Sequence, residues 1–249
     1  MPDRLTASLL DLLAVPLPGA VRSLRRRLYL PNPDKLLSLL DEEGLRRVRE
    51  IHAPGCSDEE LRNTRKPIKY LDARRQIERN LRRAEELGLH ARPPLRILDL
   101  GCGPGYFVTV CQALGHNACG FDLDENPIFR DLVAAQGVRR ITGRIEAGLP
   151  VPVDAKEGPF DLITAFAICF NNHHSEPLWG VKEWHGFLSD CATRLLSPGG
   201  EIVLKFNPKG SAAGYERFFS PDLRGFFLRC RARISGPVVC LRRENIPGS

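Results

Sequence analysis

The sequence lacks any run of 18 or more apolar residues, so no stretch of it is long enough to cross a membrane as a helix. It also lacks internal repeats and low-complexity tracts, which excludes solenoid and fibrous proteins. None of its eight cysteines forms a CxxC pair, and most lie in or near apolar runs, so we expect buried thiols in a reducing compartment and no metal site. The positive charges of Arg25 to Arg27 follow the first apolar stretch, which is not the order of a secretory signal. We therefore expect a cytoplasmic globular protein.

Positive charge is concentrated in the first part of the chain. Residues 1–93 hold 19 Lys and Arg against 14 Asp and Glu, whereas the remainder holds 17 against 16. This basic part is suited to phosphate, nucleic acid or a membrane surface, and a solvated helical face of mixed charge explains it equally well. An amphipathic segment with an Arg-rich end, such as residues 4–30, also suits peripheral membrane contact.

The pattern of apolar residues divides the chain near residue 65. Helical spacing over 35–51 and 70–88 predicts helices, whereas from Leu95 onward short apolar runs bounded by Gly and Pro alternate with helical segments. That alternation predicts a mostly parallel sheet with helices on both faces. We therefore predict a helical extension at 1–65, acting as a lid, an oligomerisation segment or a membrane contact, and an α/β domain at 66–249.

The most informative motif is ILDLGCGPGYF at residues 97–107. A buried strand ends in glycines at alternate positions, Gly101, Gly103 and Gly105, and runs into a helix. Glycine allows a tight strand-to-helix turn and lets a ligand lie against bare backbone. A dinucleotide fingerprint requires glycine at 106, where this chain has Tyr106, which argues against an NAD(P)-dependent reductase. A purely structural turn is the plain alternative.

This stretch resembles motif I of the class I methyltransferases that use S-adenosylmethionine (SAM). The resemblance implies a three-layer Rossmann-like sandwich, with a mostly parallel sheet and an antiparallel last strand. It also implies that the loop wraps the aminoacyl part of SAM, whose product is S-adenosylhomocysteine. The residues that take these roles by resemblance are Asp99, Gly101, Cys102, Gly103 and Gly105.

A second acidic position follows at the distance that the family uses. Asp122, 21 residues after Gly101, ends the next predicted strand, and its carboxylate can accept both ribose hydroxyls. Leu123 lies beside it, and Asp124 is the alternative. The resemblance also suggests that Tyr70 closes over the SAM carboxylate.

The predicted third strand leads into the segment where the family holds adenine. Arg144 occupies a position at which many members have Asp, so this chain departs from the pattern there. Ile145 is a candidate to pack on the ring, and Glu146 or a backbone amide is a candidate to read its amine.

FDLITAFAICFNNHH, residues 160–174, resembles motif IV, a strand that ends beside the transferring methyl group. Ala165 and Phe166 are expected to line the methionine part of SAM. His173 or His174 is a candidate base because histidine titrates near neutrality, with Asn171 as a substrate orienter. An ordinary pair of surface histidines is the alternative.

We therefore predict a SAM-dependent methyltransferase that methylates an oxygen of a small molecule, a sugar or a lipid-linked metabolite. An RNA or protein methyltransferase that uses the basic segment is an alternative. Nucleic acid is less favoured, because only Tyr29 and Tyr70 are interleaved with that charge and no NPPY-type motif follows the fourth strand. A non-catalytic SAM-binding protein is the third alternative, and the sequence does not indicate an oligomeric state.

Overall fold

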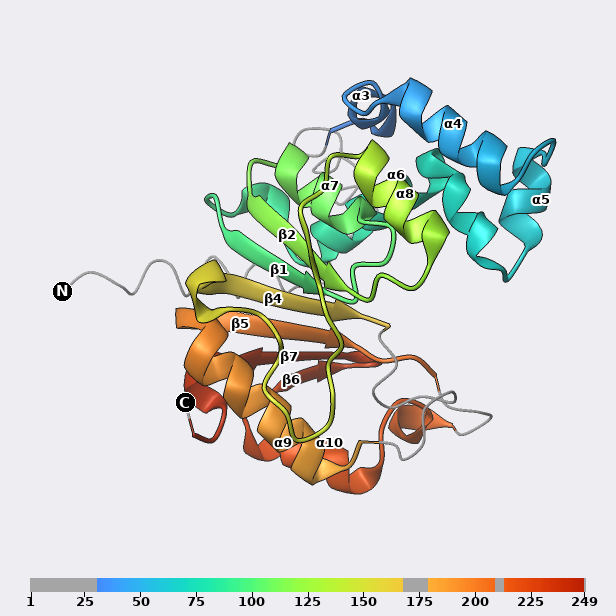
Figure 1. Ribbon diagram of the computed structural model, residues 1–249. Coiled ribbons are helices and arrows are strands. Elements are labelled where there is room, and N and C mark those ends of the chain that lie inside the picture. Colours follow the sequence, from blue (N-terminus) through green and yellow to red (C-terminus); the bar gives the residue numbers. More distant parts are fainter. Residues whose placement is uncertain (1–30, 168–178, 209–212, 249) are drawn as a thin grey trace, which may run out of the picture.

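The computed structural model describes residues 31–167, 179–208 and 213–248. Within them a seven-stranded sheet has the order β3-β2-β1-β4-β5-β7-β6 (Figure 1). The strands are β1 (Arg96–Leu100), β2 (Asn117–Asp122), β3 (Arg140–Thr142), β4 (Phe160–Phe166), β5 (Leu196–Lys205), β6 (Arg233–Ser235) and β7 (Val238–Arg242). Strands β1 to β5 pair in parallel, while β7 pairs antiparallel with both β5 and β6. The predicted mostly parallel sheet with an antiparallel last strand is confirmed.

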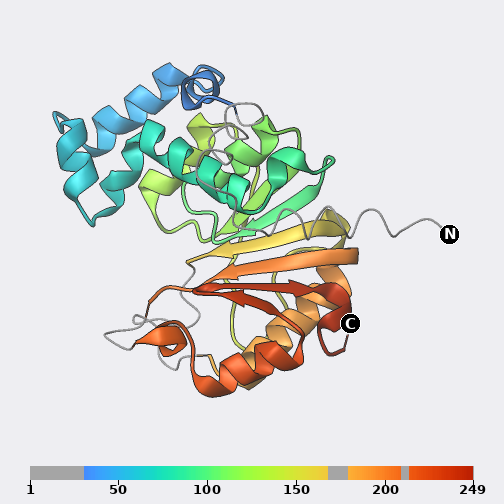
Figure 2. The same ribbon diagram turned by 180° about the vertical axis from the view of Figure 1, so that it is seen from behind.

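Helices cover both faces of this sheet, which gives three layers (Figures 1 and 2). The helices of one face are α3 (Pro33–Leu37), α4 (Glu42–His52), α5 (Asp58–Asn63), α6 (Ala73–Glu86), α7 (Tyr106–Ala113) and α8 (Pro127–Ala135). The opposite face carries α9 (Val181–Asp190) and α10 (Pro221–Arg229). Polar side chains begin several of them: Asn126 and Ser220 each precede a proline and accept a backbone N–H, as expected of helix N-caps.

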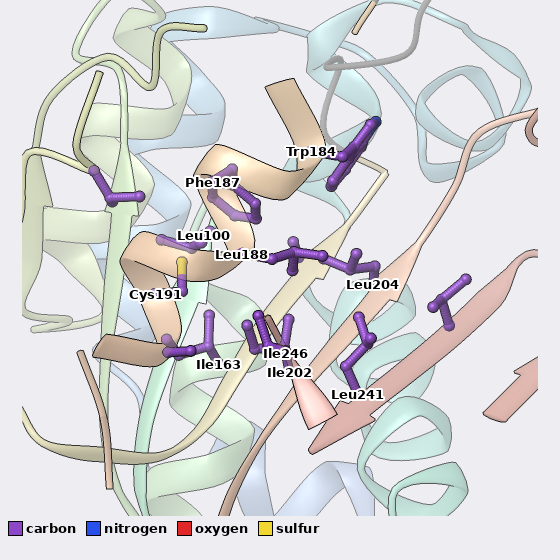
Figure 3. Close-up of a cluster of buried hydrophobic side chains, with 14 of the residues drawn as sticks. Leu100, Ile163, Trp184, Phe187, Leu188, Cys191, Ile202, Leu204, Leu241 and Ile246 are labelled. Carbon is purple, nitrogen blue, oxygen red and sulfur yellow. The ribbon is translucent and has the colours of Figure 1, made fainter. Parts of the chain in front are cut away.

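Alternation along the strands sends neighbouring side chains to opposite layers. In β1, Leu98 and Leu100 join the core under α9 and α10, where Trp184 and Leu188 also lie (Figure 3). Ile97 faces the other core, beneath α6 and α7. Asp99 follows Ile97 by two residues and therefore lies on that second face, at the carboxyl end of the strand.

The helices before residue 65 pack into the same core as the helices that follow. Leu36, Val48 and Leu61 are buried in one apolar cluster with Ile77 and Leu81 of α6. The predicted continuous helical spacing over 35–51 is interrupted, because the Asp41 side chain accepts the N–H of Gly44 and starts α4 as a new helix. Residues 1–30 lie outside the described residues, and the division at residue 65 stays a prediction.

The described residues include no helix that is long and apolar enough to span a membrane. Their His, Cys, Asp and Glu side chains do not gather in a group that could hold a metal ion. The seven cysteines in this part of the chain are free thiols.

The burial of Leu61 allows a test of how much the packing of α5 against the core contributes to stability. Its side chain is 0% exposed, so Leu61→Ala removes packed methyl groups and leaves a cavity. We expect the free energy of unfolding to fall by about 2–5 kcal/mol. Urea titration followed by circular dichroism measures the change. Leu39→Ala is the matched control, because Leu39 is 68% exposed and its truncation is expected to change little. Equal unfolding midpoints for the two variants would contradict the packing described here.

Candidate functional site

The bend after β1 is built from three glycines with left-handed backbone. Gly101, Gly103 and Gly105 have φ values of +67°, +54° and +83°, a region that side chains other than glycine rarely adopt. The N–H of Gly101 donates to the carbonyl of Phe121 in β2 at 2.7 Å, and that of Cys102 donates to the same oxygen at 3.1 Å. These bonds hold the bend against the end of β2, and Gly105 begins α7.

Asp122, the last residue of β2, ties the two strand ends together. Its Oδ2 accepts the N–H of Gly103, and its Oδ1 accepts the N–H of Leu123 at 2.7 Å. Each carboxylate oxygen has another lone pair, so the side chain can accept two further hydrogen bonds side by side. Burial raises the pKa of Asp122, while the two backbone N–H groups and Arg140 oppose that rise. Acceptance of two vicinal ribose hydroxyls needs a pair of such acceptors, and this role of Asp122 stays a prediction.

Arg140 of β3 is a charged residue near this site that the sequence did not single out. Its side chain is only 7% exposed, and it forms an ion pair with Asp124. Its Nη1 is buried and has no hydrogen-bond partner among the described residues. Arg140 therefore puts a buried positive charge beside the two acidic residues, and Asp124 faces this arginine. A single Arg in a short polar strand carries no sequence signal that would distinguish it.

Asp99 lies beneath the glycine bend and is almost wholly buried. Thr164 of β4, its partner in the parallel register, donates its hydroxyl to Asp99 Oδ1 at 2.6 Å. Burial raises the pKa of Asp99 to about 7, and the Thr164 hydrogen bond and the charge of Arg83 oppose the rise. A buried carboxyl whose pKa is raised toward 7 is typical of functional sites. A cation bound above it would favour the ionised form of this carboxyl. Thr164 was missed because the sequence does not show the register.

Tyr70, predicted to close over the donor, lies beside the bend. Its ring makes an edge-to-face contact with Phe129 of α8, with 5.1 Å between the ring centroids. Phe129 is also the nearest neighbour of a Cβ built on Gly103, at 3.7 Å. The hydroxyl of Tyr106 donates to the backbone carbonyl of Tyr70 at 3.1 Å, which fixes this position. The structure thus brings Tyr70, Phe129 and Gly103 together.

The residues predicted to bind adenine do not share one environment in the structure. Arg144 forms an ion pair with Glu125, and both side chains are exposed. Ile145 packs against the core under α9 and α10, and Glu146 is exposed. Leu123 is half-buried after Asp122. Of this group, Ile145 is the one held by the core.

The two residues at the end of β4 that were predicted to line the methionine part of SAM lie on opposite faces of the sheet. Ala165 is buried on the α9 side, while Phe166 faces α7, where it contacts Phe107 edge to face with centroids 4.9 Å apart. Ala167 then adopts φ +61° and donates its N–H to the carbonyl of Lys205 at 2.8 Å. A left-handed alanine is strained, and such residues gather at functional sites. Asn171, His173 and His174 lie outside the described residues.

Comparison with known families and curated proteins gives matches centred on this site. A family model described as "Methyltransferase domain" matches residues 70–206. The ribosomal protein L11 methyltransferase of Ralstonia nicotianae is 34% identical over 121 residues, which are 48% of this chain and 35% of that protein. The ubiquinone biosynthesis O-methyltransferase of Maricaulis maris is 30% identical in an alignment 131 residues long, which covers 48% of this chain and 44% of that protein. The chain therefore matches less than half the length of either relative.

Among solved structures, one similar chain is the 1,6-didemethyltoxoflavin-N1-methyltransferase of Burkholderia thailandensis with bound 1,6-didemethyltoxoflavin and S-adenosylhomocysteine. It is 16% identical, with a TM-score of 0.45, and the match covers 86% of this chain and 91% of that one.

The raised pKa of Asp99 predicts how stability depends on pH. The folded pKa of about 7 lies above the ordinary value of 3.8, so ionising this carboxyl costs more in the folded chain than in the unfolded one. Its contribution to stability therefore falls as pH rises from about 4 to about 7. Asp99→Asn removes this loss and retains an oxygen that can accept the Thr164 hydrogen bond. Relative to wild type, we expect the variant to gain up to roughly 4 kcal/mol across that interval.

Urea unfolding at a series of pH values measures this difference. The exposed Asp154→Asn variant is the control, since asparagine can also cap the short helix that Asp154 begins, and its pH profile is expected to follow that of wild type. Parallel profiles for wild type and Asp99→Asn would show that Asp99 is not held in this state.

Proposed function

The chain belongs to the class I SAM-dependent methyltransferase family, and on that premise we propose that it methylates an oxygen of a small molecule, a sugar or a lipid-linked metabolite. Binding of the donor in this proposal depends above all on one observation, the Asp122 carboxylate bonded to the Gly103 amide with two acceptor positions left over. When bound, SAM supplies a methyl group that its sulfonium makes electrophilic. Asp122 receives the ribose hydroxyls, and Asp99 supports the loop and faces the ammonium group.

The acceptor approaches the carboxyl ends of β4 and β5 in this proposal. Ligands of parallel sheets bind at the carboxyl edge, and the donor residues occupy the ends of β1 and β2. The next strands in the sheet order are β4 and β5. The strained Ala167 and its bond to Lys205 hold that corner rigid, which suits a site that must align two reactants.

Transfer to a hydroxyl needs alignment and the removal of one proton. The acceptor oxygen forms a bond to the methyl carbon as the carbon–sulfur bond breaks, with its electron pair going to sulfur. The hydroxyl proton passes to a base, for which His173 or His174 remains our candidate, with Asn171 orienting the substrate. A positioned base typically contributes about 10²–10⁴-fold to the rate.

Binding of the donor tests the role of Asp122. In Asp122→Asn one acceptor oxygen becomes an amide donor, which disturbs the bond from Gly103 or Leu123 and leaves a single acceptor for the ribose. We expect SAM to bind roughly 10- to 100-fold more weakly, as measured by isothermal titration calorimetry. Glu125→Gln is the matched control, because it also removes one negative charge nearby but its ion pair among the described residues is with the exposed Arg144. Undiminished binding by Asp122→Asn would refute the assigned role.

Protein methylation is a second candidate function, since one relative is named for ribosomal protein L11. The other relative is named for ubiquinone biosynthesis, and this chain matches 35% and 44% of the lengths of the two relatives. Acceptor choice therefore needs a direct measurement.

Incubation of the purified chain with methyl-labelled SAM and a cell extract distinguishes these candidates. After size fractionation we expect label in the low-mass fraction and the amount to fall with Asp122→Asn. Label confined to a protein band would favour the second candidate. Absence of transfer from a chain that binds SAM would favour the non-catalytic alternative.

A further inference from the structure

A basic pocket lies at the carboxyl end of β5, outside the residues assigned to the donor. It has a volume of about 350 Å³ and is lined by Arg79, Arg82, Arg83, Glu86 and Lys205. The four residues of α6 are spaced at i, i+3, i+4 and i+7, so they share one face of the helix. Lys205 is the last residue of β5. Four positive side chains therefore face one negative side chain in a space of the size that small ligands occupy.

Within the described part of the chain, the charges of this pocket are largely unpaired. Among the described residues, none forms an ion pair or a side-chain hydrogen bond with Arg79, Arg82 or Lys205. The first turns of α6 differ, because Arg74 pairs with Asp34 and Glu78 and Arg75 donates to a backbone carbonyl. The same helix thus satisfies its arginines at one end and leaves them available at the other.

Arg83 connects this pocket to the chemical site. Its guanidinium lies over the Phe166 ring, with its central carbon 4.8 Å from the centroid, and its Nη1 donates to Asn80. Burial lowers the pKa of Arg83, and the nearby positive charge of Arg79 lowers it further, whereas Asp99 opposes the change. An anion in the pocket would offset the loss of hydration of the Arg83 guanidinium by pairing with it. The same anion would weaken the repulsion between Arg83 and Arg79.

The position of the pocket indicates which reactant brings the anion. In the sheet order β1 is followed by β4 and then β5. With adjacent strands 4.7–4.9 Å apart, Lys205 lies about 10 Å across the sheet from the strand that carries the glycine bend. Lys205 is therefore on the acceptor side of Phe166, and Arg83 lies over the Phe166 ring itself.

We propose that this pocket binds a phosphate or carboxylate group carried by the methyl acceptor, an inference that rests on the proposed function. Planar guanidinium groups match the paired oxygens of either anion, and the lysine adds a point charge. Held there, the anionic group anchors the acceptor while its hydroxyl reaches the end of β4. The carboxylate of the donor is the other possible source of the same chemistry, and the experiment separates the two.

Pyrophosphate is the probe, titrated by calorimetry into the full chain at low ionic strength, with SAM titrated separately into the same samples. The test variant is Arg79→Gln with Arg82→Gln, two exposed positions where glutamine is a good helix former. The control is Arg47→Gln with Arg229→Gln, which removes the same charge from exposed positions of α4 and α10. Lys205→Gln tests the strand side of the pocket.

We expect wild type and control to bind pyrophosphate alike, and the pocket variants to bind it roughly tenfold or more weakly. SAM is expected to bind all of them equally. Pyrophosphate should also inhibit labelling of the low-mass product by wild type. Absence of pyrophosphate binding, or equal binding by pocket and control variants, would overturn the proposal. A parallel loss of SAM binding in the pocket variants would assign the anion to the donor instead. A wild type that binds pyrophosphate but not SAM would refute the proposed function and leave the anion site standing.

Discussion

The hydrogen bond from the Gly103 amide to the Asp122 carboxylate is the contact on which the site depends. It joins a loop that follows β1 to a side chain that ends β2, so neither can shift without the other. Three of the five residues of this loop are glycines in left-handed conformations, so at those positions the backbone carries no side chain of its own. The same carboxylate is left with acceptors for a diol. In the proposed site, one carboxylate therefore both fixes the shape of the loop and receives the sugar.

Around that contact lies a group of partly or wholly buried charges, whose removal from water costs the fold free energy. Asp99 is held by Thr164 from the neighbouring strand, Arg140 stands next to Asp122 and Asp124, and Arg83 lies over Phe166. Buried charges are costly unless paired, so their concentration along one edge of the sheet is best explained by what binds there. The apolar cores on the two faces hold the strands that carry these groups in place.

The features that could be predicted from the sequence are those encoded locally. The glycine spacing, the alternation of strands and helices, and Asp122 at its distance from the bend each lie within a short segment, and the sheet follows the predicted pattern. Thr164 and Arg140 could not be predicted, because their importance depends on which strand residues stand opposite each other. The pocket was missed for a related reason. Helical spacing indicates that Arg79 and Arg82 share a face, but not that this face meets Lys205, 120 or more residues later.

In the proposed arrangement, support of the donor loop and binding of the anion use different faces of helix α6. Its buried face, with Ile77, Leu81 and Ala84, belongs to the core that supports the donor loop, so substitutions there alter the whole fold. Its arginine face borders the pocket and contributes little to that core. In the proposed arrangement, the exposed arginines of α6 can therefore be exchanged while the donor site is kept.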